Sequence, residues 1–249
     1  MSQSARINLI RAITLVGLWL AWEGLARSGL LYRGVVPSNF SVLAAAWKLL
    51  TDPAFYPHVL RTSQEVGVGF VIGAFFGLAL PLLIGRIRLV GGVVDNYVQV
   101  LAPTPKIVFL PVLLVLFGVD AGSKIAMGAA SAFFPVAVET FAALRQVNPV
   151  LVNVARSFNA TLWQSITKLD LPSMAQPVLS GMRLGLGVAI VGVLLAEIKL
   201  SNRGLGFLTI NFYNAFHIPD MYAVLLIVFV FAAVANALIS WLSRALSKG

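Results

Sequence analysis

Residues 66–85 read VGVGFVIGAFFGLALPLLIG, a run of apolar residues and glycines bounded by Glu65 and Arg86. An α-helix rises about 1.5 Å per residue, so roughly 20 residues cross the hydrocarbon core of a bilayer. The run is therefore long enough to span a membrane, and so is the uncharged stretch 221–243. Both stretches predict transmembrane helices.

The composition extends this prediction to the whole chain. Hydrophobic residues make up 59% of the 249 residues and charged residues only 11%, against about 25% charged in an ordinary soluble domain. We therefore expect an all-α membrane protein with about six transmembrane helices, built as one domain over residues 1–249. The predicted spans are 10–25, 66–85, 89–117, 124–144, 175–198 and 221–243, with a loop at 146–172 between the fourth and the fifth.

The N-terminal stretch has two interpretations. Arg6 and Arg11 precede the short apolar run 12–22, as in a secretory signal peptide. Glu23 follows directly, without a small-residue cleavage site, so we predict an uncleaved first helix. Six spans then return both termini to one side, and the loops carry a small excess of Lys and Arg on the cytoplasmic side if the termini lie there.

The 18 Lys and Arg residues outnumber the 9 Asp and Glu residues without forming a basic patch. They occur singly or in pairs at the ends of apolar runs, where helices meet lipid headgroups. A nucleic-acid-binding protein would show a basic stripe with interleaved aromatic residues. We therefore expect membrane lipid, and no nucleic acid, as a partner. The chain has no cysteine, which excludes disulfides, thiolate metal sites and a cysteine nucleophile.

The loop between the fourth and fifth spans carries signals for two short helices. Asn148 followed by Pro149 predicts a helix start, because asparagine accepts hydrogen bonds from free amides and proline is tolerated in the first turn. Asn159 can end this helix in the left-handed conformation. Thr161 can cap a second helix, which Pro172 should limit. Two short helices in a water-exposed loop predict a docking element for a soluble partner.

The same loop resembles the cytoplasmic loop of the permease subunits of binding-protein-dependent ABC importers. The family pattern is Glu-Ala-Ala, three residues, Gly, nine residues and Ile-x-Leu-Pro. Here it falls on Asn153, Val154, Ala155, Asn159 and the segment 169–172, so Asn153 lacks the carboxylate of the family and Asn159 replaces the glycine. The asparagine at position 159 can adopt the same turn.

Other segments resemble the nitrate, sulfonate, taurine and bicarbonate branch of that family. The most specific is Val154-Ala-Arg-Ser-Phe-Asn-Ala-Thr-Leu-Trp-Gln164. Further matching segments are Pro37-Ser38, Pro103-Thr-Pro-Lys106, Phe117-Gly118, Ser123-Lys124, Phe133-Phe-Pro135, Ala196-Glu197 and Gly204-Leu-Gly206. The resemblance covers nearly the whole chain.

The resemblance implies a type I ABC importer permease fold in the bacterial inner (plasma) membrane, with both termini cytoplasmic. It also implies a second permease copy, a dimer of ATPase subunits and a periplasmic or lipid-anchored binding protein as partners. ATP and Mg would be bound by the ATPase, and no cofactor by this chain. The implied ATPase-coupling residues are Asn153, Val154, Ala155, Arg156, Ser157, Phe158, Asn159, Ala160, Thr161 and Pro172. The alternative is that residues 148–172 merely connect two spans.

The sequence does not predict an enzyme. A phosphate-binding loop needs G-x-x-x-x-G-K-[ST], and the segment 118–124 has one residue too few between its glycines. No H-E-x-x-H or G-x-S-x-G motif occurs, so we expect no catalytic residues and no metal site. Gly181, Gly185 and Gly187 follow no strand, and we interpret them as sites of close helix packing.

Ionisable residues inside the spans are candidates for a translocation pathway, because a charge facing lipid costs several kcal/mol. Prolines in the third and fourth spans free carbonyls that need protein or water partners, which places the pathway beside these spans. The candidate residues are Lys106, Phe134, Glu139, Arg183, Gly187 and Glu197, followed by Asp95. Alternatively, Glu139 and Arg183 form an ion pair that braces the helices and does not contact the solute.

The resembled branch implies a small, anionic solute of the sulfonate, taurine, nitrate or bicarbonate class. The alternatives are a neutral or heterocyclic solute carried by the same machinery, or an ATP-independent secondary transporter. A secondary transporter should show matching halves with broken helices, and no such repeat is found in this sequence.

Overall fold

The computed structural model describes residues 3–29 and 34–246, and every regular element in these ranges is helical. Met1 and Gly249, the termini that the sequence places in the cytoplasm, lie outside the described residues. The long helices are α1 (Gln3–Arg27), α3 (Tyr56–Ile84), α6 (Ala121–Gln146), α9 (Leu171–Leu200) and α11 (Ile218–Leu246). The shorter elements are α2 (Asn39–Thr51), η1 (Pro53–Phe55), α4 (Arg88–Leu101), η2 (Lys106–Phe109), α5 (Leu110–Phe117), α7 (Pro149–Ser157), α8 (Leu162–Ser165), η3 (Ile166–Asp170) and α10 (Leu205–Asn214).

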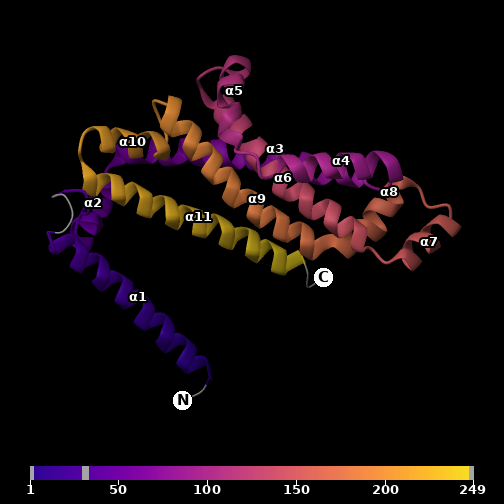
Figure 1. Cartoon of the computed structure of the whole chain (residues 1–249), viewed down its shortest axis with the longest axis horizontal. Coiled ribbons are helices and arrows are strands. Elements are labelled where there is room, and N and C mark those ends of the chain that lie inside the picture. The colour runs from indigo at the N-terminus through magenta and orange to yellow at the C-terminus, as the bar shows by residue number, and fades with distance from the viewer. Residues whose placement is uncertain (1–2, 30–33, 247–249) are drawn as a thin grey trace.

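Helix α6 lies at the centre of the bundle, packed along its length against α3 and α9 (Figure 1). Glycines of α3 allow this close approach. A Cβ atom at Gly73 would lie 2.3 Å from the carbonyl oxygen of Ala129, and one at Gly77 would lie 2.8 Å from that of Phe133. Small residues at this spacing let helices pack backbone to backbone, where lipid supplies no hydrophobic driving force for association.

The other face of α6 meets glycines of α9. A Cβ atom at Gly181 would lie 2.8 Å from the Cβ atom of Glu139, and one at Gly185 would lie 3.2 Å from the carbonyl oxygen of Ala132. This confirms the predicted close packing at these two positions. Gly187 differs, because a Cβ atom there would meet no atom within 4 Å. The helical period turns Gly187 away from α6, so the prediction of close packing at this glycine is wrong.

Helix α3 begins at Tyr56, ten residues before the uncharged run at 66–85. The helix continues through Arg61 and Glu65 because these side chains pair within it, with Arg61 Nε 2.7 Å from Glu65 Oε1. Because the two charges lie one helical turn apart and pair with each other, the helix does not have to end at either of them.

The third predicted span, 89–117, is broken. Residues Leu89–Leu101 and Lys106–Phe117 form two helical pieces bent by 96°, so that α5 projects sideways from the bundle (Figure 1). Pro103 and Pro105 lie in the break, where they remove backbone donors. Five helices of the described residues are long and apolar enough to cross a membrane, or six if the bent pair counts as one span.

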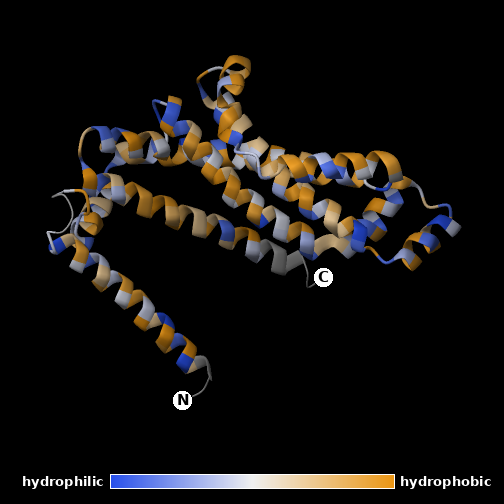
Figure 2. Ribbon diagram, in the orientation of Figure 1, coloured by the Kyte–Doolittle hydropathy of each residue, from blue (hydrophilic) through white to orange (hydrophobic). Residues whose placement is uncertain are grey.

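The bundle is elongated, and its two ends differ. We call the end that carries α7 and α8 the loop end, and the opposite end, which carries α10, the α10 end (Figure 1). Helix α1 runs toward the α10 end, and α11 runs away from it. The start of α1 and the end of α11 therefore both lie away from the α10 end. Figure 2 shows hydrophobic residues along the long helices and hydrophilic ones more often in the turns at both ends.

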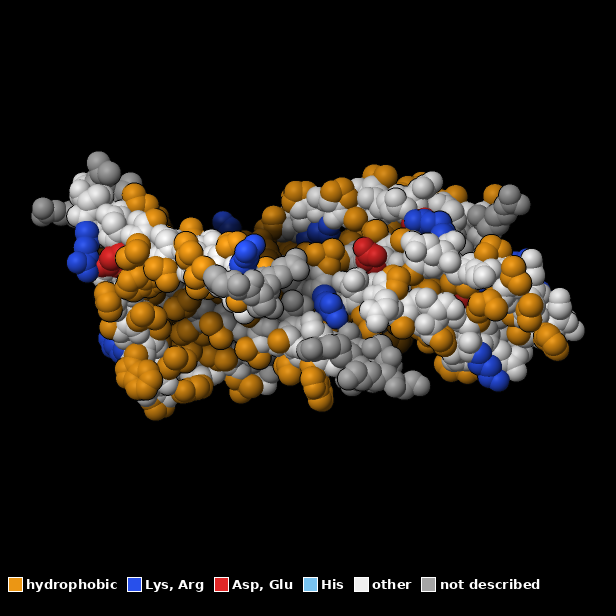
Figure 3. Space-filling model, turned by 90° about the horizontal axis from the view of Figure 1, so that it is seen from below, with side chains coloured by type: hydrophobic (Ala, Val, Ile, Leu, Met, Phe, Trp, Pro, Cys, Tyr) orange, Lys and Arg blue, Asp and Glu red, His pale blue; other side chains and the backbone are white. Residues whose placement is uncertain are grey.

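The outer surface of the bundle suits lipid. Large apolar side chains of α1 and α11 face outward, among them Leu15, Leu18, Phe229 and Leu238, each more than 60% exposed. In Figure 3 hydrophobic side chains cover much of the visible face, and Lys and Arg side chains are scattered singly over it. The Lys and Arg side chains that the structure describes on this face do not form a continuous basic stripe of the kind that binds nucleic acid.

Candidate translocation cavity and coupling loop

The loop end is organised first by helix α7, which begins as the sequence predicts. The side chain of Asn148 accepts a hydrogen bond from the backbone N–H of Val150 at 2.9 Å, and Pro149 occupies the first turn. The asparagine thereby satisfies one of the amides that have no partner within the helix. The predicted cap at Asn148 is confirmed.

Helix α7 ends in a turn centred on Asn159, whose φ of 53° is left-handed. The N–H of Asn159 donates to the carbonyl of Arg156, and the N–H of Ala160 donates to the carbonyl of Ala155, both at 2.9 Å. These two bonds satisfy the last free carbonyls of the helix, as a Schellman motif does. The prediction that Asn159 takes the left-handed position is confirmed.

The second loop helix, α8, begins with the predicted cap at Thr161. Thr161 Oγ1 accepts from the N–H of Gln164 at 3.3 Å, and Gln164 Oε1 accepts from the N–H of Thr161 at 2.9 Å, which forms a complete capping box. The prediction that Pro172 limits this helix is wrong. One π-helical turn, η3, leads from α8 into α9, and Pro172 falls in the first turn of α9, where it needs no donor.

The coupling loop, residues 146–172, exposes apolar side chains. Val154 and Phe158 are 46% and 83% exposed, and Trp163 on α8 is 73% exposed. Asn153, Arg156 and Ser157 are also exposed, and the hydroxyl of Ser157 donates to the carbonyl of Asn153 at 3.0 Å. Exposed apolar side chains grouped in a polar loop mark an interaction surface.

Two ion pairs that were not predicted brace the loop end of the bundle. Arg86, after α3, contacts both carboxylate oxygens of Asp170, which is fully buried in the π-helical turn. Arg145, near the end of α6, pairs with Asp95 of α4. Asp95, a pathway candidate, therefore serves as a brace here. The partners are 84 and 50 residues apart, so helix periodicity gives no signal for either pair.

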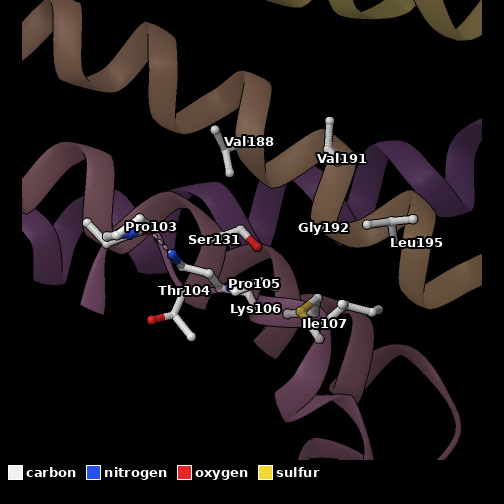
Figure 4. A pocket seen from close by; sticks show the side chains of 12 residues that line it. Pro103, Thr104, Pro105, Lys106, Ile107, Ser131, Val188, Val191, Gly192 and Leu195 are labelled. Carbon is white, nitrogen blue, oxygen red and sulfur yellow. Dashed lines mark hydrogen bonds between the residues drawn. The ribbon is translucent and has the colours of Figure 1, made fainter. Parts of the chain in front are cut away.

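A cavity of about 300 Å³ lies at the break of the third span. In Figure 4 the turn 103–107 forms one wall, side chains of α9 face it from the other side, and Ser131 of α6 lies between them. The described lining residues are Ala102, Pro103, Thr104, Pro105, Lys106, Ile107, Met127, Ser131, Val188, Val191, Gly192 and Leu195. Pro103 and Pro105, two of the prolines that the sequence argument uses, therefore line this cavity.

Lys106 is the single charged residue among the described residues that line the cavity. Its ammonium donates to the carbonyls of Leu101 and Ala102, which lie at the end of α4 just before the break. It also lies 4.5 Å from the ring centroid of Phe134, a cation–π contact. The structure therefore brings together two of the six pathway candidates, Lys106 and Phe134.

The remaining candidates lie elsewhere. Glu139 of α6 lies against α9, where a Cβ atom at Gly181 would be 2.8 Å from its own Cβ atom. Arg183 and Gly187 line a separate hollow of about 300 Å³ between α9 and α11. Glu197 is fully buried near the α10 end, where its carboxylate accepts hydrogen bonds from Thr62 and from the backbone of Gly206. The six candidates therefore do not form one site.

Curated relatives match most of the chain. It is 28% identical over 97% of its length to the putative aliphatic sulfonates transport permease protein SsuC of Bacillus subtilis (strain 168), covering 86% of that protein. It is also 28% identical to the taurine transport system permease protein TauC of Escherichia coli (strain K12), over 78% of this chain and 73% of TauC. The nitrate import permease protein NrtB of Synechococcus elongatus is 24% identical, over 88% of this chain and 84% of NrtB.

Solved structures share the fold. An inward-facing conformation of the MetNI methionine ABC transporter superposes with a TM-score of 0.61, at 20% identity, over 83% of this chain and 96% of that chain. A crystal structure of an amino acid ABC transporter with histidines gives a TM-score of 0.59, at 18% identity, over 83% and 98%. The predicted all-α fold of the ABC importer permeases is confirmed.

The family comparison agrees with the broken bundle, its coupling loop and these relatives. The sequence model described as the binding-protein-dependent transport system inner membrane component matches residues 69–249, which include α6, the coupling loop and α9. The chain belongs to this family of multi-pass membrane components of transport systems.

Proposed function

We propose that the chain forms, with a second permease copy, the translocation pathway for a small anionic solute of the sulfonate, taurine, nitrate or bicarbonate class. The observation that carries the solute class is Lys106, the single charged residue among the described lining of the cavity. A cation in a low-dielectric cavity attracts an anion more strongly than it would in water. The similarity to transport permeases named for aliphatic sulfonates, taurine and nitrate supports the same class.

The energy source in this proposal is a separate ATPase dimer that docks on the coupling loop, so the chain itself hydrolyses no ATP. The exposed Val154, Phe158 and Trp163 support this docking, because a water-exposed apolar patch needs a protein partner. The coupling loop and both termini then lie in the cytoplasm, and the α10 end faces the binding protein. ATP and Mg belong to the ATPase partner.

Reconstituted transport tests the solute class. The permease, its ATPase and its binding protein are placed in liposomes, and uptake of a labelled sulfonate or nitrate is measured. Lys106→Met should reduce uptake about tenfold or more, because an ion-assisted contact is worth about 1.5–3 kcal/mol. Lys106→Arg should retain most of it. Lys48→Met, a change at an exposed lysine of α2, is the control.

Two outcomes would contradict the proposal. Unchanged anion uptake by Lys106→Met would remove the role of the cation, and uptake limited to a neutral heterocycle would reassign the solute. Cysteines placed at Phe134 and Gly187 in this cysteine-free chain test the pathway itself. Their accessibility should change when vanadate traps the ATPase, and unchanged accessibility at both positions would contradict alternating access.

A further inference from the structure

A cluster of buried ionisable side chains lies near the α10 end, away from the cavity and the coupling loop. Glu65 of α3, Lys124 of α6 and Glu197 of α9 are each 1% exposed or less. Burying charged groups is costly unless they are paired and hydrogen-bonded. The proposed transport function uses none of these three side chains.

Glu197 holds the start of α10. Its Oε2 accepts the N–H of Gly206 at 2.7 Å, and its Oε1 accepts the hydroxyl of Thr62 at 2.6 Å. Thr62 in turn accepts the N–H of Leu205 at 2.8 Å. A Cβ atom at position 204 would lie 2.3 Å from Glu197 Oε1, so Gly204 is required for this approach. The first amides of α10 are therefore satisfied by α3 and α9 rather than by water.

Glu65 has a carboxylate oxygen without a donor. Its Oε1 accepts from Arg61 Nε at 2.7 Å, whereas its Oε2 is buried and has no hydrogen-bond partner among the described residues. The carboxyl groups of Glu65 and Glu197 lie within hydrogen-bonding reach of each other. Ionised carboxylates only accept hydrogen bonds, so two of them in contact need a proton between them.

The neighbouring charges do not replace that proton. The ammonium of Lys124 donates to the carbonyls of Val119, Asp120 and Leu200, and not to either glutamate. Arg61 pairs with Glu65 and also with the exposed carboxylate of Asp120, so its charge is shared between two carboxylates.

His58 and Arg203 lie at the edge of the cluster. His58 Nδ1 accepts the N–H of Gly204 at 3.1 Å, which is the hydrogen bond of a neutral imidazole. Arg203, beside His58, is exposed to solvent.

We propose that Glu65 and Glu197 form a buried proton-binding site, in which the proton held between the two carboxyls fastens α10 to α3 and α9. Loss of the proton leaves two adjacent carboxylates, which repel each other. Glu197 then separates from Glu65, and α10, whose first amides bond to Thr62 of α3 and to Glu197 of α9, cannot keep both of these acceptors. Raising the pH therefore loosens α10, at the face where the proposed function places the binding protein. The proton site itself does not rest on the transport proposal.

Cysteine labelling of the full-length chain in lipid nanodiscs tests the site. Leu208 is a 9% exposed residue of α10, and Leu208→Cys reacts with a maleimide only when α10 opens. Phe216→Cys, at an 85% exposed position, reports the reactivity of an open thiol at each pH. The ratio of the two labelling rates should rise several-fold from about neutral to about pH 9–10 if a buried carboxyl gives up its proton.

Glu65→Gln is the decisive variant. Its amide N–H can donate to Glu197 at any pH, so the labelling ratio should be flat and low. Glu139→Gln, the same change on α6 outside the cluster, should keep the pH dependence of the parent protein. A flat ratio in the parent chain, or an unchanged rise in Glu65→Gln, would overturn the proposal.

Infrared spectroscopy of the parent chain gives an independent readout if Glu65→Gln does not fold. A protonated carboxyl absorbs at a frequency distinct from that of a carboxylate. The band should be present at neutral pH and lost at alkaline pH, and Glu197→Gln should lack it. Absence of the band from the parent chain at neutral pH would also overturn the proposal.

Discussion

At the scale of single residues, the spacing of α3 and α6 depends on Gly73. We expect Gly73→Ala to lower stability by about 1–3 kcal/mol, because its Cβ atom would overlap a backbone carbonyl that cannot move aside. Gly67→Ala on the same helix is the control, since a Cβ atom there meets nothing within 4 Å. Thermal unfolding in detergent measures both variants, and equal midpoints would contradict the packing role of Gly73.

A second residue-scale prediction concerns Asp170. Asp170→Asn should destabilise the loop end by about 3–5 kcal/mol, because the positive charge of Arg86 would then lie beside a neutral side chain. Asp52→Asn, at an exposed aspartate before η1, should cost much less. Limited proteolysis within residues 146–172 gives the readout, and equal cleavage of the two variants would contradict the prediction.

At the scale of elements, the turn after α7 should determine coupling. Asn159→Gly should retain ATP-driven uptake, because glycine adopts a positive φ without strain. Asn159→Val should lose most of it, because a β-branched residue is strained there by about 1–3 kcal/mol. Uptake by the reconstituted complex is compared with its ATP hydrolysis. Full uptake by the valine variant would show that the turn is not needed.

The elements also show which features the sequence can predict. Asn148, Asn159 and Thr161 act on backbone groups within a few residues, so local rules found all three. The pairs Arg86–Asp170 and Thr62–Glu197 join residues 84 and 135 positions apart, and no local pattern encodes such contacts. Pro172 was misjudged because a π-helical turn shifts the hydrogen-bond register, which an α-helical rule does not anticipate.

At the scale of the whole molecule, the two ends should lie on opposite sides of the membrane. Phe158 at the loop end and Phe216 after α10 are almost equally exposed, at 83% and 85%, and the chain has no cysteine of its own. In intact cells an impermeant maleimide should label Phe216→Cys and spare Phe158→Cys. Permeabilised cells are the control, in which both should react. The opposite pattern in intact cells would invert the proposed orientation.

The molecule also shows why only some of the residues around the cavity could be predicted. Prolines and Lys106 mark the cavity, because broken helices and buried charges are costly in lipid wherever they occur. Glu197 is equally costly, yet it stabilises a helix terminus. Hydropathy identifies a charge that is costly to bury. The role of that charge depends on the helices that surround it.

Helices α8 and α9 join through the π-helical turn into one continuous helix from Leu162 to Leu200. This helix has 39 residues, with the coupling loop at its near end and Val188 and Val191 on the cavity wall farther along. We expect a displacement of Trp163 to be transmitted along this helix toward the cavity, about the close contacts of Gly181 and Gly185 with α6. A closing motion beneath the loop would shift the wall that faces Lys106 without any unfolding in between.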